Sequence, residues 1–206
     1  MNKGDRERKE YEFTKEIVKE GERVASIVRG LLAFARDTKD VKGPVSLEHV
    51  ITSTLVMLDA QMRRDGIILK VHIDPDLPDI VANIQQLQQV FLNIINNARY
   101  ALNQKYPGVH EDKILEITSE VTTFDGRPHV RIKFCDHGTG IPASVITRVK
   151  DPFFTTKPTD RGTGLGLSIS NGIISDYGGK LTVSSVEGEY TRVVVELPVQ
   201  LNPHHP

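Results

Sequence analysis

The sequence predicts a two-layer α/β sandwich preceded by a long helix. Predicted helices alternate with antiparallel strand pairs, a pattern that favours two layers over a doubly wound parallel sheet. The 206 residues, 38% of them hydrophobic, are enough for one domain with an appendage. We therefore divide the chain into a helix and linker at residues 1–43, a sandwich domain at residues 44–200, and a disordered tail at residues 201–206.

The N-terminal helix is predicted from Arg6 to Arg36, a proline-free segment rich in charged residues. Its apolar residues recur at the spacing of one helical face, and they are Phe13, Ile17, Val24, Ile27, Val28, Leu31, Leu32 and Ala35. Such a stripe packs either on its own domain or on other helices in a bundle. The length of the helix and the break at residues 42–44 favour the bundle.

The first half of the domain is predicted to contain two helices and two strands. Ser46 caps a helix that ends at Gly66, and strands follow over residues 67–74 and 80–83. Residues 84–106 contain neither glycine nor proline, and their apolar residues return every three or four positions. This segment is therefore predicted to be a helix.

The second half is predicted to contain two hairpins and two further helices. Segments 113–121 and 129–136 alternate apolar and polar residues around the turn-forming pair Asp125-Gly126. A short helix is predicted over residues 142–149 and another over residues 165–177, closed by Gly178 and Gly179. Segments 180–186 and 191–199 form the terminal hairpin.

The composition excludes some classes of function. A net charge of −1 does not indicate a nucleic-acid partner, and it leaves a local basic patch open. The single cysteine, Cys135, forbids an internal disulfide and fits a reducing compartment. The sequence shows neither a signal peptide nor an apolar run of about 18–20 residues. We expect a cytoplasmic protein, or the cytoplasmic portion of a membrane-bound one.

Three glycines, Gly162, Gly164 and Gly166, alternate just before the last predicted helix. Glycines gather where the backbone turns sharply or approaches a ligand, and a free helix N-terminus suits phosphate. A flexible loop is the alternative, and the glycines alone leave the two open.

Two asparagines and an aspartate are further candidates for a binding site. Asn93 and Asn97 share one face of the predicted helix at residues 84–106, where they either meet solvent or offer amide oxygens to Mg²⁺. Asp136 ends a strand before a glycine-containing segment, where it either forms a turn or accepts hydrogen bonds from a planar ligand.

Four segments together resemble a known family. They are NIINNARYAL (93–102), DHGTGI (136–141), PFFTTK (152–157) and GTGLGLSIS (162–170). Their order resembles the N, G1, F and G2 boxes of the histidine-kinase catalytic domain, in the superfamily that includes gyrase and the heat-shock chaperone. The resemblance covers about residues 45–200. It implies the Bergerat ATP-binding fold, in which helices cover one face of a mixed, mostly antiparallel sheet.

The resemblance also implies roles for individual residues. Asn97 is expected to bind Mg²⁺ between the ATP phosphates, with Asn93 beside it, and Asp136 to hold the adenine amine. Gly138 and Gly140 are expected to let the base approach. The three later glycines form the hinge of a short lid at residues 158–161. Further expected ATP contacts are Arg99, Tyr100, Ile141, Phe154, Thr155, Thr156, Lys157, Thr163, Leu165 and Leu167, with Lys157 grouped with the two asparagines as catalytic. Many relatives carry lysine where this chain has Tyr100.

The function implied is that of an ATP-dependent protein-histidine kinase of two-component signalling. The gyrase-like hydrolases carry a water-activating glutamate at the position of Asn93, and an amide cannot accept a proton from water. An ATPase or a serine kinase of the same superfamily, or a non-catalytic ATP-binding interaction module, is the alternative.

The expected partners follow from the same resemblance. Residues 1–43 resemble the second helix of a dimerisation hairpin, so a homodimer and a response regulator receiver domain are expected partners. Nothing before His49 is a histidine, so the phosphate acceptor is expected on a hairpin helix absent from this chain, and the chain is not expected to phosphorylate itself.

Overall fold

The computed structural model describes residues 42–124, 126–158 and 162–199, together with Tyr11, Phe13, Thr14, Ile17, Val18 and Gly21, which are helical. The rest of the predicted N-terminal helix and the predicted tail lie outside the described residues, as do residues 159–161 of the predicted lid. No helix in the described ranges is long and apolar enough to cross a membrane.

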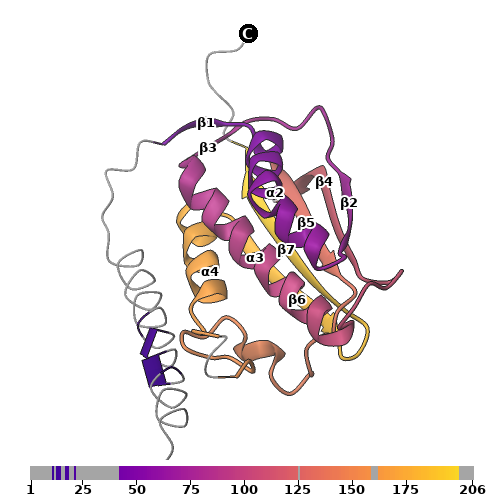
Figure 1. The fold of residues 1–206 in the computed structure, drawn as a ribbon. Helices are drawn as coiled ribbons and strands as arrows, with labels where there is room; N and C mark the ends of the chain where they lie inside the picture. Colours follow the sequence, from indigo (N-terminus) through magenta and orange to yellow (C-terminus); the bar gives the residue numbers. More distant parts are fainter. Residues whose placement is uncertain are drawn as a thin grey trace, which may run out of the picture.

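A five-stranded mixed sheet forms one layer of the domain (Figure 1). Its strands are β2 (Ile68–His72), β4 (Ile114–Phe124), β5 (Arg127–Asp136), β7 (Tyr190–Pro198) and β6 (Lys180–Val186), in that spatial order. The β2–β4 pair is parallel and the other three pairs are antiparallel. The predicted mixed, mostly antiparallel sheet is confirmed.

Three helices, α2 (Leu47–Arg64), α3 (Ile84–Lys105) and α4 (Gly166–Asp176), lie together on one face of this sheet (Figure 1). Helix α3 contacts both α2 and α4, and also packs on β5. The rings of Phe91 on α3 and Phe134 on β5 lie 5.4 Å apart in the core. The central helix is thereby fixed to the central strand, with its polar Asn93 and Asn97 on a half-buried flank.

Side-chain caps begin the first two helices. The Ser46 hydroxyl accepts a hydrogen bond from the His49 N–H, and the Asn83 side chain accepts from the N–H groups of Gln85 and Gln86. Each cap satisfies N–H groups that the first turn of a helix leaves unpaired. The helix start predicted at Ser46 is confirmed.

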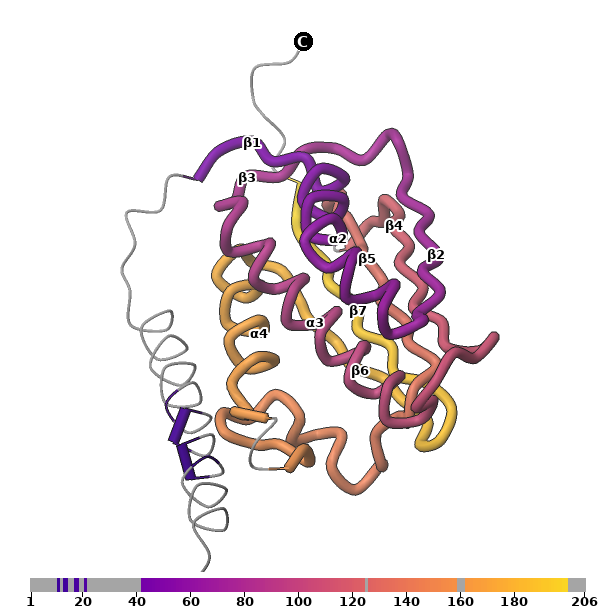
Figure 2. Tube along the Cα trace, in the orientation of Figure 1, coloured from indigo at the N-terminus to yellow at the C-terminus, as the bar shows by residue number. Residues whose placement is uncertain are grey.

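Two elements differ from the prediction. A short ribbon pairs β1 (Gly43–Val45) with β3 (Ile80–Ala82), and its first strand had no sequence signal. The helix predicted over residues 142–149 is a single 3₁₀ turn, η1 (Ile146–Arg148), in which the Arg148 N–H bonds the Val145 carbonyl. This three-residue spacing is typical of short connecting turns. Figure 2 shows the segment that contains η1 lying at the end of the sheet where α4 begins.

Candidate functional site

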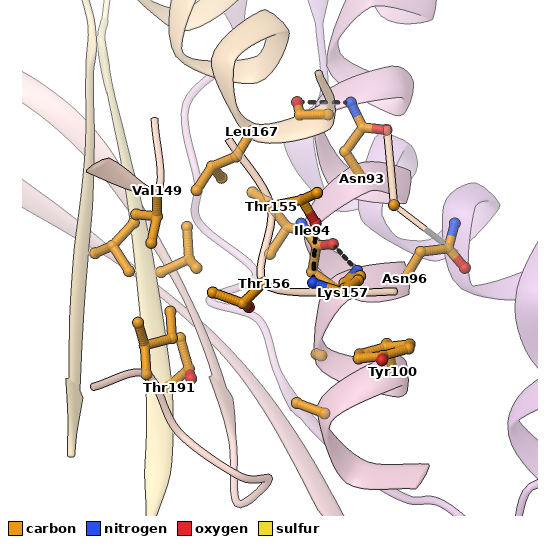
Figure 3. A pocket seen from close by; sticks show the side chains of 18 of the residues that line it. Asn93, Ile94, Asn96, Tyr100, Val149, Thr155, Thr156, Lys157, Leu167 and Thr191 are labelled. Carbon is orange, nitrogen blue, oxygen red and sulfur yellow. Dashed lines mark hydrogen bonds between the residues drawn. The ribbon is translucent and has the colours of Figure 1, made fainter. Parts of the chain in front are cut away.

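A cavity of about 460 Å³ lies between α3, the end of β5, the β6–β7 hairpin and the start of α4. Figure 3 shows Asn93 and Tyr100 across this cavity from Val149 and Thr191. Most of the residues expected from the sequence line it. They are Asn93, Asn97, Tyr100, Asp136, Gly140, Ile141, Phe154, Thr155, Thr156, Lys157, Gly162, Thr163, Gly164, Gly166 and Leu167.

Asn97 and Lys157 are joined across the cavity wall. The Lys157 ammonium donates a 2.6 Å hydrogen bond to Oδ1 of Asn97 and lies 4.5 Å from the centre of the Tyr100 ring. Figure 3 shows Lys157 reaching from its loop to α3, beside Tyr100. Burial lowers the pKa of Lys157 because a desolvated ammonium favours its neutral form. The amide oxygen of Asn97 is thus aimed at a cation.

Asn93 joins α3 to the first turns of α4. Its side-chain nitrogen donates to the Gly166 carbonyl at 3.1 Å and to the Ser170 hydroxyl at 3.2 Å. The Ser170 hydroxyl also donates to the Gly166 carbonyl, which closes a small network. Asn93 therefore sets the position of the start of α4 relative to Asn97, one helical turn away.

Asp136 is the buried acid of the site. It is 5% exposed at the end of β5, and one carboxylate oxygen accepts a 3.0 Å hydrogen bond from the Gly138 N–H. Burial raises the pKa of Asp136 to about 7, although the Gly138 N–H and the charge of Lys105 oppose the rise. A carboxylate this poorly solvated gains much from a ligand that donates a hydrogen bond to it.

The glycines after Asp136 are required by packing within the protein. Gly140 has a φ of 64°, and a Cβ there would lie 2.1 Å from the Val186 carbonyl oxygen. A Cβ on Gly138 would lie 2.7 Å from that of Ala101, and Gly138 does not line the cavity. Gly138 is thus in close contact with α3 and Gly140 with the β6–β7 turn, while Gly140 also lines the cavity. That these glycines let the base approach stays a prediction.

The start of α4 is held by the loop before it. The Gly164 carbonyl accepts a 3.0 Å hydrogen bond from the Phe153 N–H, and both residues have positive φ angles, 68° and 65°. Among the described residues, no side chain caps the N-terminus of α4, and no acidic residue lies in its first turn. The first N–H groups of α4 therefore remain available to a ligand. Leu165 directly precedes the helix and does not line the cavity.

Arg99 lies outside the cavity, contrary to its expected contact with ATP. Its guanidinium donates to the Asp65 carboxylate and, at 2.7 Å, to the Gln61 side chain of α2. Burial alone raises the pKa of Asp65, but hydrogen bonds from Asn103 and Arg99 outweigh it and leave the pKa below its usual value. The helical rotation from Asn97 to Arg99 points the guanidinium to the neighbouring helix.

Replacement of Arg99 by Gln is expected to weaken folding and leave nucleotide affinity unchanged. The free energy of unfolding should fall by about 1–3 kcal/mol, because the half-buried Asp65 loses a charged partner. Because folding lowers the pKa of Asp65, this residue stabilises the folded protein above its unfolded pKa and loses that effect in acid. The free energies of unfolding of the wild type and of Arg99→Gln should therefore converge at low pH. Urea denaturation and nucleotide titration measure the two quantities. Arg64→Gln is the matched control, since Arg64 is exposed and lies 4.0 Å from Asp65.

Several lining residues were not among the expected contacts, although Asn96, Ala101 and Thr139 lie inside the segments that carry the resemblance. Ala101 and Gln104 follow Asn97 by four and seven residues, so the helical repeat is the signal that identifies them. Thr191 lies beside Asp136 in the register of β7 against β5, and that pairing has no local sequence signal. Asn96 and Thr139 also line the cavity.

A metal ion here requires ligands other than a cluster of acids. Within the described ranges, no three His, Cys, Asp or Glu residues come together to hold one. The Asn97 amide oxygen, which already faces a cation, is a hard neutral donor that suits Mg²⁺. Because Mg²⁺ commonly keeps several waters and binds phosphate oxygens, one protein ligand fits this site.

A family model and curated relatives of this chain point to the same protein family. The model of the histidine kinase-, DNA gyrase B- and HSP90-like ATPases matches residues 82–201. Sporulation kinase E of Bacillus subtilis (strain 168) is 31% identical over 186 residues, 90% of this chain and 24% of its own length. Sensor histidine kinase ZraS of Escherichia coli O157:H7 is 31% identical over 196 residues, 95% of this chain and 40% of its own. The chain thus spans about a quarter to two fifths of these curated relatives.

Solved structures agree with the fold. The nucleotide-free catalytic domain of histidine kinase ThkA superposes with a TM-score of 0.63 at 29% identity, covering 76% of this chain and 95% of that one. ThkA in complex with the response regulator protein TrrA gives a TM-score of 0.70 at 25% identity, covering 91% and 51%.

Proposed function

Because the chain belongs to the histidine kinase-, DNA gyrase B- and HSP90-like ATPase family, we propose that its domain binds Mg-ATP and transfers the γ-phosphate to a histidine on a separate helix. One observation carries the proposal above the others. A buried acid for the base, Asp136, and a cation-facing amide oxygen, on Asn97, line the same cavity as the start of α4.

Each part of the nucleotide has a matching group. The Asp136 carboxylate accepts a hydrogen bond from the adenine amine. The uncapped start of α4 offers N–H groups and a positive dipole to the phosphates. Asn97 would hold Mg²⁺, and the ion would neutralise negative charge at the phosphates during transfer. Lys157 supplies a second positive charge at the phosphates.

The absence of a base in the cavity lining favours transfer over hydrolysis. Among the described residues that line the cavity, Asp136 is the one carboxylate, and it is assigned to adenine. Asn93, an amide engaged with α4, takes no proton from water. Phosphoryl transfer depends mainly on positioning and charge neutralisation, so the site remains competent once a nucleophile is supplied.

The proposed acceptor is the histidine of a dimerisation hairpin, and the proposed downstream partner is a response regulator receiver domain. ThkA has been solved with the response regulator TrrA, and ThkA matches 91% of this chain. We expect residues 1–43 to supply a hairpin helix and to support a homodimer. Magnesium as the cofactor and the cytoplasm as the location belong to the same proposal.

Phosphotransfer in trans tests this function. The protein is mixed with Mg²⁺, radiolabelled ATP and a separate hairpin that carries the histidine. Label that appears on the hairpin and is labile in acid but stable in base identifies phosphohistidine.

Two controls define the result. A hairpin with the histidine replaced by Gln should stay unlabelled. The Asn97→Asp variant should transfer nothing, because a carboxylate beside Lys157 forms an ion pair there and repels phosphate. Tight ATP binding without labelled hairpin would favour the alternative of a non-catalytic nucleotide-binding module.

A further inference from the structure

The Lys157 ammonium rests on two neutral groups. Its described contacts are the amide oxygen of Asn97 at 2.6 Å and the face of the Tyr100 ring at 4.5 Å. Within the described ranges, no ion pair includes Lys157. A half-buried cation is thus held without a described counter-charge, in a cavity that we assign to an anionic ligand.

Both sides of this contact are held by local structure. Tyr100 follows Asn97 by three residues, so the ring and the amide share one face of α3. The Lys157 N–H donates to the Thr155 hydroxyl at 3.1 Å. A Cβ on Gly162 would lie 2.9 Å from the Cβ of Lys157, so the backbone at Gly162 packs closely against the backbone at Lys157. The lysine is therefore brought to α3 by its backbone as well as by its side chain.

The Lys157 ammonium bonds the same oxygen, Oδ1 of Asn97, that we assign as the magnesium ligand. A Mg²⁺ bound to Oδ1 of Asn97 would lie about 2.1 Å from it. The Lys157 nitrogen lies 2.6 Å from the same oxygen. Two cations that share one neutral oxygen repel each other, so Mg²⁺ and Lys157 would compete for Asn97.

We propose that Tyr100 is a positioning residue that holds Lys157 on Asn97 in the nucleotide-free protein, so that this lysine competes with Mg²⁺. When Mg²⁺ takes Asn97, the ammonium passes to the phosphates of the bound nucleotide. The inference rests on the proposed nucleotide site, but not on phosphate transfer.

Competition predicts that removal of the lysine makes magnesium bind more readily. The protein is saturated with Mg-free ADP and titrated with Mg²⁺, and the half-saturating Mg²⁺ concentration is measured by calorimetry. Lys157→Met should lower that concentration about tenfold, because one charge-assisted hydrogen bond no longer has to break.

The Tyr100 variants separate positioning from general structure. Tyr100→Phe keeps the ring face and should keep the wild-type magnesium midpoint. Tyr100→Leu removes the face and should shift the midpoint in the direction of Lys157→Met. Lys150→Met is the matched control, since Lys150 lies outside the cavity lining and contacts the Leu181 carbonyl at 3.5 Å.

The outcomes distinguish this inference from the function on which it rests. A midpoint that is unchanged or raised in Lys157→Met, with normal ADP binding by the wild type, overturns the competition and leaves the nucleotide site intact. A wild-type protein that binds no ADP overturns both. A midpoint lowered in Lys157→Met but equal in the two Tyr100 variants overturns the role of Tyr100.

Discussion

The Asp136→Asn variant is expected to lose nucleotide binding and to gain stability. The side chain is 5% exposed, and burial raises the pKa of Asp136 to about 7 from a usual value of 3.8. An ionised carboxylate in this place is thus unfavourable for folding but valuable as a hydrogen-bond acceptor. Asparagine keeps the shape and the oxygen that faces the Gly138 N–H, yet it removes the charge.

The two effects have predictable sizes. Loss of a hydrogen bond to a charged acceptor, about 3 kcal/mol, should weaken ADP binding about 100-fold. The free energy of unfolding of the nucleotide-free protein should rise by about 4 kcal/mol at pH 8, from a shift of about three pKa units at 1.36 kcal/mol each. Calorimetric titration and urea denaturation measure the two quantities.

The sign of the pH dependence follows from the raised pKa. The folded protein holds a proton on Asp136 more tightly than the unfolded chain does, so this residue favours folding in acid. That contribution is lost as pH rises from about 4 to about 7. In the wild type, ADP affinity should rise between pH 6 and pH 8, because the ionised carboxylate accepts the adenine amine. Asp136→Asn should show neither trend at this site.

Asp151→Asn is the matched control for these measurements. Asp151 is exposed and lies 3.9 Å from Arg148, so its replacement should leave stability and affinity near the wild-type values. Wild-type ADP affinity in Asp136→Asn would contradict the assignment of Asp136 to adenine. An unchanged free energy of unfolding would contradict the burial argument instead.

The fold was predictable where the pattern is local. The apolar period of residues 84–106 predicts α3 to within one residue, and the turn at Asp125-Gly126 predicts the β4–β5 hairpin. Strand β1 is three residues long and exists through its pairing with β3. The short helix predicted at residues 142–149 is one 3₁₀ turn, in which the hydrogen bond spans three residues. The pairing of β1 with β3 is a tertiary contact that no local pattern carries.

The candidate site was predictable in its members but not in their contacts. The four segments identify most of the residues that line the cavity. The side chains of Asn93 and Ser170 form a hydrogen bond although they are 77 residues apart in the sequence, and those of Lys157 and Asn97 do so at 60 residues apart. No spacing rule connects residues so far apart, so the sequence predicts that Asn93 and Lys157 belong to the site but not that they bond Ser170 and Asn97. The sequence of α3 does not show which of its flanks meets α2 and which meets α4.

The Gly164→Ala variant is expected to disrupt the start of α4. Gly164 has a φ of 68°, and a Cβ there would lie 2.4 Å from the carbonyl carbon of Phe153 and 2.6 Å from its oxygen. Because both neighbours are backbone atoms, no side-chain rotation relieves the contact. The loop must move, and the hydrogen bond from the Phe153 N–H to the Gly164 carbonyl must lengthen or break.

The displacement should reach the nucleotide through Gly166, two residues later. The Gly166 carbonyl accepts from Asn93, so a shifted helix start loses its register with Asn97 on α3. We expect ADP affinity to fall at least about tenfold, which corresponds to the loss of one hydrogen bond. The free energy of unfolding should fall by about 2 kcal/mol, because alanine is strained at a positive φ and its Cβ would overlap the Phe153 backbone. Nucleotide titration and urea denaturation test both.

Gly172→Ala provides the matched control within the same helix. A Cβ on Gly172 meets nothing within 4 Å, and the residue lies inside α4. Alanine there should raise the free energy of unfolding by about 0.5–1 kcal/mol, because it restricts the unfolded chain and favours helix. A Gly164→Ala protein that binds ADP like the wild type would show that the start of α4 does not hold the phosphates. Loss of affinity in Gly172→Ala as well would place the phosphate contact in the body of the helix.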